Sequence, residues 1–150
     1  LFHKVREELG AAFYVRAGGD LLSDHGFFAV SAGLDNKRAK EVLEAILGEL
    51  RKISSEKVSP AELKRAKSHL TGTMLIGLES SDDLAGFYGN QELFRKNILL
   101  PQDIVKKIES VTAMDILKVS KEIMKPKNLN LALIGPYKDK KEFDRILASF

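Results

Sequence analysis

The sequence predicts an α+β domain in which an antiparallel sheet is covered by several helices. Three observations carry this prediction: two β-like runs come early, a series of helical segments follows, and a third β-like run comes close to the end. Segregation of helices from strands is typical of α+β layers rather than of a doubly wound parallel sheet. Three strands are few for this many helices, so we also expect at least one strand upstream of Leu1.

The three strands are expected where β-branched, aromatic and small residues gather. Residues 12–17 and 26–32 predict an antiparallel pair. The glycine- and serine-containing stretch of residues 18–25 predicts a connection longer than a tight hairpin. The third strand is expected at residues 129–134, where apolar side chains alternate before Gly135-Pro136.

The helices are predicted from apolar spacing and from capping residues. Residues 36–53 place apolar side chains at three- and four-residue steps, which makes one buried stripe. Ser59-Pro60-Ala61-Glu62 combines a cap, a proline at the first helical position and a capping-box glutamate, and predicts a helix to about Leu78. Further helices are expected over residues 81–94, from Pro101, from Thr112, and over residues 143–150. Residues 1–9 indicate the end of a helix that Gly10 stops.

Composition restricts the class of protein. A length of 150 residues, 44% hydrophobic and 30% charged, is typical of one ordinary globular domain, and we see no linker that divides it. A net charge of +3, mixed along helices, argues against a nucleic-acid partner. The longest apolar runs fall far short of the roughly 20 residues that span a bilayer, so no membrane contact is expected.

With no cysteine, a cytoplasmic location is expected. Because the chain opens on Leu1 without methionine, we expect a fragment truncated on its N-terminal side.

No residue pattern predicts a metal or catalytic site within the chain. None of the three histidines, His3, His25 and His69, has the His-x-x-Glu-His spacing that places two imidazoles on one helix face for zinc. Gly-x-Ser-x-Gly, Walker and dinucleotide patterns are also missing. The acidic run from Glu79 to Asp83 is explained by a helix end followed by a new cap.

Several short stretches stand out by their order and spacing: Leu1-Phe2 with Val5-Arg6-Glu7-Glu8 and Gly10, Val30-Ser31-Ala32-Gly33, Ser59 to Leu70, Glu79-Ser80, Val111-Thr112 with Asp115-Ile116, and Leu133-Ile134-Gly135-Pro136. Together they resemble the pitrilysin/insulinase family of zinc peptidases, which has the LuxS/processing-peptidase fold. The resemblance covers nearly the whole chain and is to the later domain, which lacks the zinc motif.

The resemblance implies a protease built from repeated α+β domains around a chamber. In that family, zinc and its general-base glutamate lie in one domain, and a later domain contributes an arginine and a tyrosine to substrate binding and transition-state stabilisation. For this chain it implies no bound cofactor, with zinc held by a partner domain in cis or in a partner subunit of a homo- or heterodimer. It also implies that the chain does not hydrolyse peptides alone.

Arg6 falls on the family arginine, where its guanidinium can donate to the carbonyls of a bound peptide. From the residues alone, a second interpretation stays open: an arginine at a helix end bonded to the last carbonyls, or paired with Glu7 or Glu8.

Phe13 falls on the family tyrosine and has no hydroxyl. Loss of one such hydrogen-bond donor weakens transition-state stabilisation by roughly 3 kcal/mol. Tyr14 carries a hydroxyl, but adjacent residues of a strand face opposite ways. Tyr14 can therefore take over only through a bulge or a one-residue shift.

The expected function is that of the substrate-binding, non-metal domain of a zinc metallopeptidase-like protein, with Arg6, Phe13 and Tyr14 as substrate-binding residues. The alternative is a non-catalytic structural or assembly member of the same family. A free-standing peptide-binding module is a third interpretation. A His-x-x-Glu-His motif upstream in the full-length gene, or in an adjacent paralogue, favours the protease over the scaffold.

Overall fold

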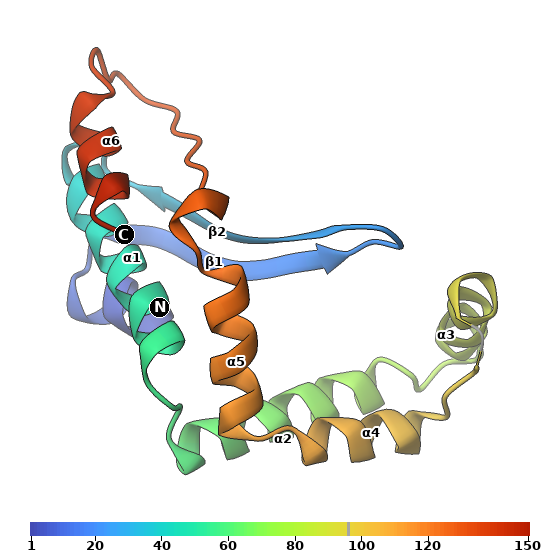
Figure 1. Cartoon of the computed structure of the whole chain (residues 1–150). Coiled ribbons are helices and arrows are strands. Elements are labelled where there is room, and N and C mark those ends of the chain that lie inside the picture. Colours follow the sequence, from blue (N-terminus) through green and yellow to red (C-terminus); the bar gives the residue numbers. More distant parts are fainter. Residues whose placement is uncertain (96) are drawn as a thin grey trace. The chain divides into compact units, whose positions relative to one another are not determined.

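The computed structural model describes residues 1–95 and 97–150. Two compact units are present: one combines Leu1–Glu56 with Leu117–Phe150, and the other is Lys57–Ile116. Figure 1 labels the helices and strands of both units, which we describe one at a time.

The first unit is built on an antiparallel hairpin of β1 (Ala12–Leu21) and β2 (Gly26–Leu34). The prediction of a long connection is wrong, because the strands continue through residues 18–20 and turn tightly, with the Leu22 amide donating to the His25 carbonyl at 2.8 Å. Gly19 makes this continuation feasible: a Cβ there would lie 2.0 Å from the Phe27 carbonyl oxygen. Only glycine tolerates so close an approach of two backbones.

The third predicted strand is wrong. Residues 129–134 are not paired into a sheet, and the sheet of the described residues has the two strands β1 and β2. Alternation of apolar residues predicts which side chains share a face, but a strand also needs a neighbouring backbone for its hydrogen bonds. Within the described residues, no strand lies against this segment.

The core of the first unit lies between the hairpin, the first turn of the chain and α1 (Ala39–Ser55). Val5, Ala11, Val15 and Val42 form its buried cluster, and Val42 is only 1% exposed. Burial of one such valine stabilises the fold by about 1.5–3 kcal/mol. The stripe predicted on α1 is confirmed, since its buried residues are spaced along one face: Ala39, Val42, Leu47 and Leu50.

Short helical elements complete the first unit: η1 (His3–Glu8), η2 (Asn36–Arg38), η3 (Pro126–Asn128) and α6 (Lys141–Ala148). α6 packs along α1, as Figure 1 shows. Two polar contacts join these helices: Lys40 pairs with Glu142, and Arg51 donates to the Ser149 carbonyl at 2.6 Å. Phe143 is buried in the same region.

The second unit is helical and consists of α2 (Pro60–Ile76), α3 (Ser81–Phe94) and α4 (Pro101–Ser110). The predicted caps are confirmed: Ser59 accepts from the Glu62 amide at 3.2 Å, and Ser80 accepts from the Asp83 amide at 3.1 Å. α5 (Ala113–Ile123) begins in this unit, where Thr112 accepts from the Asp115 amide, and ends in the first.

The α+β class with an antiparallel sheet is therefore confirmed. In the part of the chain that the structure describes, no helix has both the length and the apolar character needed to cross a membrane.

Candidate functional site

The candidate site is the corner where η1 gives way to β1. η1 is wound as a π-helix, with the Leu9 amide donating to the Lys4 carbonyl at 3.1 Å, five residues back. Gly10 has a φ of +55°, which lets the chain turn directly into β1. The predicted glycine stop is thus confirmed. Val5 is fully buried, so it anchors the corner and leaves its neighbour Arg6 on the surface.

Arg6 is exposed, and its Cζ lies 5.0 Å from the centroid of the Phe2 ring. The neighbouring carboxylates are engaged elsewhere, because Glu7 pairs with His3 and Glu8 pairs with Lys4 at 2.7 Å. Within residues 1–95 and 97–150, no carboxylate or carbonyl accepts a hydrogen bond from Arg6. Its guanidinium therefore keeps its donors available to a ligand.

The Lys4–Glu8 pair also sets the charge beside Arg6. The hydrogen bond from Lys4 lowers the pKa of the Glu8 carboxyl, and the same bond raises the pKa of Lys4. Both groups are therefore charged at neutral pH and largely compensate each other. Glu7, the other carboxylate of η1, pairs with His3, so neither carboxylate of η1 is paired with Arg6.

Arg38, which sequence reasoning missed, is the last residue of η2 and binds the backbone of this corner. Its guanidinium donates to the Leu9 and Gly10 carbonyls, both at 3.0 Å, and to Glu41 at 2.7 and 2.8 Å. The hydrogen bond from Arg38 lowers the pKa of Glu41. No local pattern could have predicted these bonds, because Arg38 is 28 and 29 residues away from the two carbonyls.

A β-bulge at Phe13 decides where the two aromatic side chains point. Ala12 pairs with Leu34 and Tyr14 pairs with Gly33, so Phe13 is the extra residue on β1. Ala12 and Val15, three residues apart, both pack on the core. Phe13 and Tyr14 between them both leave the core, and their exposed fractions are 77% and 49%. The expectation that these neighbours face opposite ways is thus corrected by the bulge, since a regular strand would turn Phe13 to the side of Val15.

Tyr14 is held by two contacts on the outer face of the hairpin. Its ring covers Gly33, where a Cβ would lie 2.3 Å from the Tyr14 Cε1 atom. The Arg16 guanidinium lies 6.0 Å from the ring centroid, at the outer limit of a cation–π contact. Phe13 has no comparable contact among the described aromatic pairs and cation–π pairs.

The structure places Arg6, Phe13 and Tyr14 within one corner and exposes all three. Among the described residues, no hydrogen bond or cation–π contact joins Arg6 to Phe13 or Tyr14. The cation–π contact of Arg6 is with Phe2, and that of Tyr14 is with Arg16. The same residues contain no group of three His, Cys, Asp or Glu side chains that could hold a metal ion. The corner can therefore bind and orient a ligand, but its residues do not fit a zinc site.

Comparison with known proteins identifies the family that this chain resembles. Residues 1–70 match the family model described as the Peptidase M16 inactive domain. This confirms the predicted resemblance to the non-zinc domain of pitrilysin-type peptidases.

The relatives found by sequence carry protease or respiratory-complex names. The chain is 31% identical over 140 residues to an uncharacterised zinc protease of Streptomyces coelicolor, a match that covers 93% of this chain and 30% of the relative. It is 28% identical to an uncharacterised zinc protease of Mycobacterium leprae, over 98% of this chain and 33% of the relative. It is 26% identical to mouse cytochrome b-c1 complex subunit 2, over 77% of this chain and 25% of the relative. The chain thus spans about a third of the length of the first two relatives.

Solved structures support the fold. A complex III structure from Candida albicans matches with a TM-score of 0.70 and 18% identity, over 79% of this chain and 28% of the other. A protease from Helicobacter pylori matches with a TM-score of 0.63 and 23% identity, over 82% of this chain and 30% of the other.

Proposed function

Because residues 1–70 match the inactive domain of peptidase family M16, we propose that this chain is the substrate-binding, non-metal domain of a zinc-dependent peptidase-like protein. A separate zinc domain, in the same polypeptide or in a partner subunit, performs the hydrolysis. The observation that carries the proposal is the state of Arg6: it is exposed and has no carboxylate partner among the described residues, although Glu7 and Glu8 follow it directly.

The role of Arg6 is to hold the main chain of an extended peptide. A guanidinium presents five donors in a fixed plane and stays protonated, so it can donate to peptide carbonyls at any pH at which the protein is folded. Phe2 supports the guanidinium by a cation–π contact, and the buried side chain of Val5 fixes the backbone beneath it. Arg6 thereby positions the substrate and contributes no proton transfer.

Tyr14 supplies the hydroxyl that Phe13 lacks. Tyr14 faces away from the core because it alternates with Val15, and the bulge turns Phe13 out of the core as well, next to the Tyr14 hydroxyl. A donor aimed at a carbonyl that gains negative charge stabilises the transition state more than the ground state. Phe13, more exposed than Tyr14, gives the peptide an apolar surface.

When a zinc ion is bound in the partner domain, it supplies the activated water for hydrolysis. The residues of this chain neither activate that water nor transfer a proton. They hold the peptide in place, and the tyrosine hydroxyl meets the carbonyl oxygen.

The second candidate is a structural or assembly subunit, and Phe13 is the observation that favours it. A subunit that does not catalyse hydrolysis has no need for the tyrosine hydroxyl that Phe13 lacks. The similarity to a cytochrome b-c1 complex subunit, and the fold shared with a complex III chain, are in keeping with this candidate.

The deciding experiment replaces Arg6 in the complete protein together with its zinc domain. For Arg6→Ala we expect kcat/KM for a peptide to fall at least about tenfold, equivalent to a loss of about 1.4 kcal/mol of transition-state binding. Arg65→Ala is the matched control, because Arg65 is an exposed arginine on α2. The melting temperatures of both variants should match that of the parent.

Two results would oppose the proposal. An unchanged kcat/KM in Arg6→Ala would show that Arg6 does not bind the substrate. A complete, correctly assembled protein that cleaves no peptide with zinc present would favour the structural subunit instead.

A further inference from the structure

The outer face of the hairpin, which is the face turned away from the core, continues beyond Tyr14 toward the turn. Because Val15 is buried in the core and successive strand residues alternate, every second residue of β1 after Tyr14 also faces outward. Each of these residues has a partner directly opposite on β2. The three outward pairs beyond Tyr14 are Arg16 with Ser31, Gly18 with Ala29, and Asp20 with Phe27.

A shallow hollow of about 350 Å³ lies on this face, and all six residues of these pairs line it. Gly18 and Ala29 make its floor, because they carry at most one methyl group. The larger pairs stand at its two ends, with Arg16 on the side of Tyr14 and Asp20 on the side of the turn. The outer face therefore presents a cation, a hollow and a carboxylate in that order.

Arg16 is exposed, and its hydrogen-bond donors are unused. Its guanidinium lies 6.0 Å from the centroid of the Tyr14 ring, a contact that engages none of its N–H groups. Within residues 1–95 and 97–150, no carboxylate, hydroxyl or carbonyl accepts a hydrogen bond from it. Asp20, the carboxylate on the same face, is four residues further along β1, a separation of roughly 13 Å between Cα atoms.

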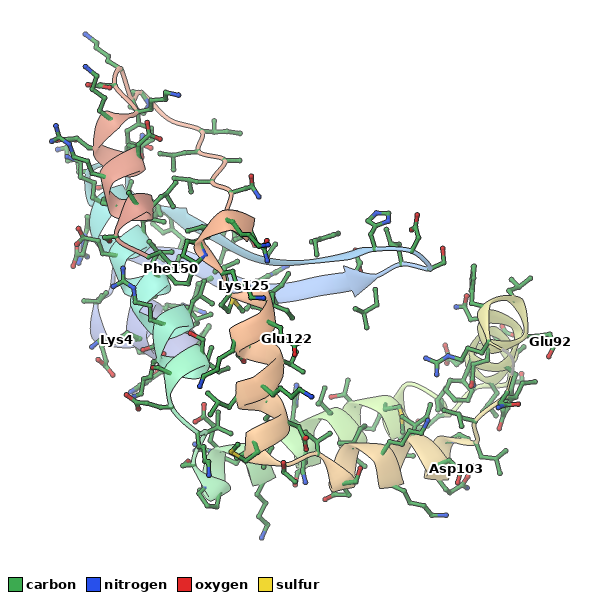
Figure 2. The ribbon with its side chains drawn as sticks, in the orientation of Figure 1. Lys4, Glu92, Asp103, Glu122, Lys125 and Phe150 are labelled. Atoms are coloured by element: carbon green, nitrogen blue, oxygen red, sulfur yellow. The ribbon has the colours of Figure 1, made fainter. Side chains whose placement is uncertain are left out.

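Arg16 resembles Arg6 in this respect, since neither guanidinium has a carboxylate partner among the described residues. Lys4, which is labelled in Figure 2, is by contrast paired with Glu8. The two arginines precede and follow Tyr14 along the chain. Both can therefore bind acceptor groups of one peptide that passes Tyr14.

We propose that Arg16 is a specificity-determining residue, which selects peptides with an acidic side chain within two residues of the carbonyl held by Tyr14. The carboxylate accepts hydrogen bonds from the Arg16 guanidinium, and the hydroxyl of Ser31, directly opposite, donates a further one. This inference rests on the proposed function, because it takes the peptide to be bound beside Arg6 and Tyr14.

The spacing of the outer face fits an extended peptide. Outward residues of a strand are roughly 6.6 Å apart, and so are the side chains on one side of an extended peptide. A peptide whose carbonyl meets the Tyr14 hydroxyl thus brings a side chain one or two residues away over Arg16. A carboxylate there gains a planar, bidentate partner, whereas a lysine would meet a like charge.

The hollow and Asp20 restrict the acidic side chain to the end beside Tyr14. At Gly18 a Cβ would have no atom within 4 Å, so the floor leaves room for the peptide to continue past Arg16. Asp20 at the far end repels a second carboxylate. The acidic preference is therefore expected at one peptide position and not along the whole segment.

Steady-state kinetics on the complete protein with its zinc domain tests this inference. A set of peptides carries Glu, Gln or Lys at each of the two positions on either side of the scissile bond, and mass spectrometry verifies the cleavage site. For the parent we expect kcat/KM to be at least about tenfold higher with Glu than with Lys at one of these positions, mainly through KM.

Arg16→Glu should invert this preference, so that Lys is favoured over Glu at the same position. Arg16→Gln should bring the two peptides to within about threefold of each other. A merely structural role of Arg16 would not reverse a charge preference. Arg65→Glu is the matched control, because it makes the same change of charge at an exposed position of α2 and should keep the preference of the parent.

Two results would overturn the inference. The parent could show no preference between Glu and Lys at any of the four positions, or Arg16→Glu could keep the preference of the parent. Either result can occur while Arg6→Ala still loses turnover, so the proposed function does not fall with this inference.

A complete protein that cleaves no peptide would count against the proposed function, and binding then tests Arg16. Fluorescence anisotropy should find that the Glu peptide binds more tightly than the Lys peptide, with the order reversed in Arg16→Glu. Equal affinities of the two peptides for the parent would overturn the inference.

Discussion

The phenol ring of Tyr14 covers Gly33 on the neighbouring strand and occupies the space that a side chain at position 33 would need. This contact exists because the bulge at Phe13 brings Tyr14 opposite Gly33, whereas Tyr14 would stand opposite Ala32 if the Ala12–Leu34 register continued unbroken. Tyr14 faces outward because it alternates with the buried Val15, and the bulge matches it with Gly33, whose bare backbone leaves room for the ring.

Tyr14→Phe tests whether this hydroxyl has replaced the one that Phe13 lacks. In the complete protein with its zinc domain, we expect kcat to fall roughly 100-fold, the usual effect of removing one oxyanion donor. The fold should be unaffected, because the ring and its place over Gly33 remain. Steady-state kinetics with one peptide measures the change.

Phe13→Tyr is the complementary variant. If Tyr14 already donates the hydrogen bond, a second hydroxyl one residue earlier should leave kcat within about threefold of the parent. A large rise in kcat for Phe13→Tyr, with no loss for Tyr14→Phe, would show that the bulge does not rescue the missing hydroxyl.

Gly33→Ala tests the placement of Tyr14. The new methyl group would lie 2.3 Å from Cε1 and 2.8 Å from Cδ1 of the ring, so the ring must move. We expect turnover to fall as it does in Tyr14→Phe, and the ring proton resonances of Tyr14 to shift. Gly18→Ala is the matched control on β1, because its Cβ would have no atom within 4 Å. Equal turnover in the two alanine variants would contradict this account.

The Arg38–Glu41 pair predicts a pH-dependent contribution to stability. Glu41 has its pKa lowered below the usual 4.5 by the hydrogen bond from Arg38, so the folded state favours the ionised carboxylate. This contribution is present above pH 4.5 and is lost as the pH falls through the lowered pKa. Urea denaturation should therefore find Glu41→Gln less stable than the parent at pH 7, with a smaller difference at pH 3.

Glu44→Gln is the control for that experiment, because Glu44 is exposed on the same helix and does not contact Arg38. If the difference between the parent and Glu41→Gln were the same at pH 7 and pH 3, its cause would not be the charge of Glu41.

The hydrogen bonds of Gln91 lead to a prediction about stability in the second unit. Its side chain is buried and makes two hydrogen bonds to the backbone of Leu99: Nε2 donates to the carbonyl at 3.1 Å, and Oε1 accepts from the amide at 2.9 Å. Gln91→Leu leaves both groups unpaired, so we expect a loss of about 1–3 kcal/mol in the free energy of unfolding. Amide exchange of Leu99 should also become faster.

The exposed residue Gln102 provides the control for this variant, since Gln102→Leu should leave stability within about 0.5 kcal/mol of the parent. Unchanged exchange of the Leu99 amide in Gln91→Leu would mean that these two hydrogen bonds do not hold the segment.

Elements with local signals were predicted well. The helix over residues 81–94 has the predicted ends, and the caps at Ser59 and Thr112 make the expected bonds, because a cap involves residues only three positions apart. The buried stripe of α1 was predicted for the same reason, since its spacing follows from the helix period. The two misjudged features, the hairpin turn and the strand at residues 129–134, both depend on which backbone lies alongside.

The candidate site shows the same division. By itself the sequence determined the resemblance to the inactive domain of peptidase family M16, the glycine corner at Gly10, an arginine at position 6 and the absence of a tyrosine at position 13. Only the tertiary structure decided that Arg38 binds the carbonyls of the corner, that a bulge turns Phe13 out of the core, and that the Tyr14 ring lies over Gly33. The physical reason is that residue identity and local spacing are properties of one segment, whereas a strand register and a long-range hydrogen bond exist only once a second segment has packed against it.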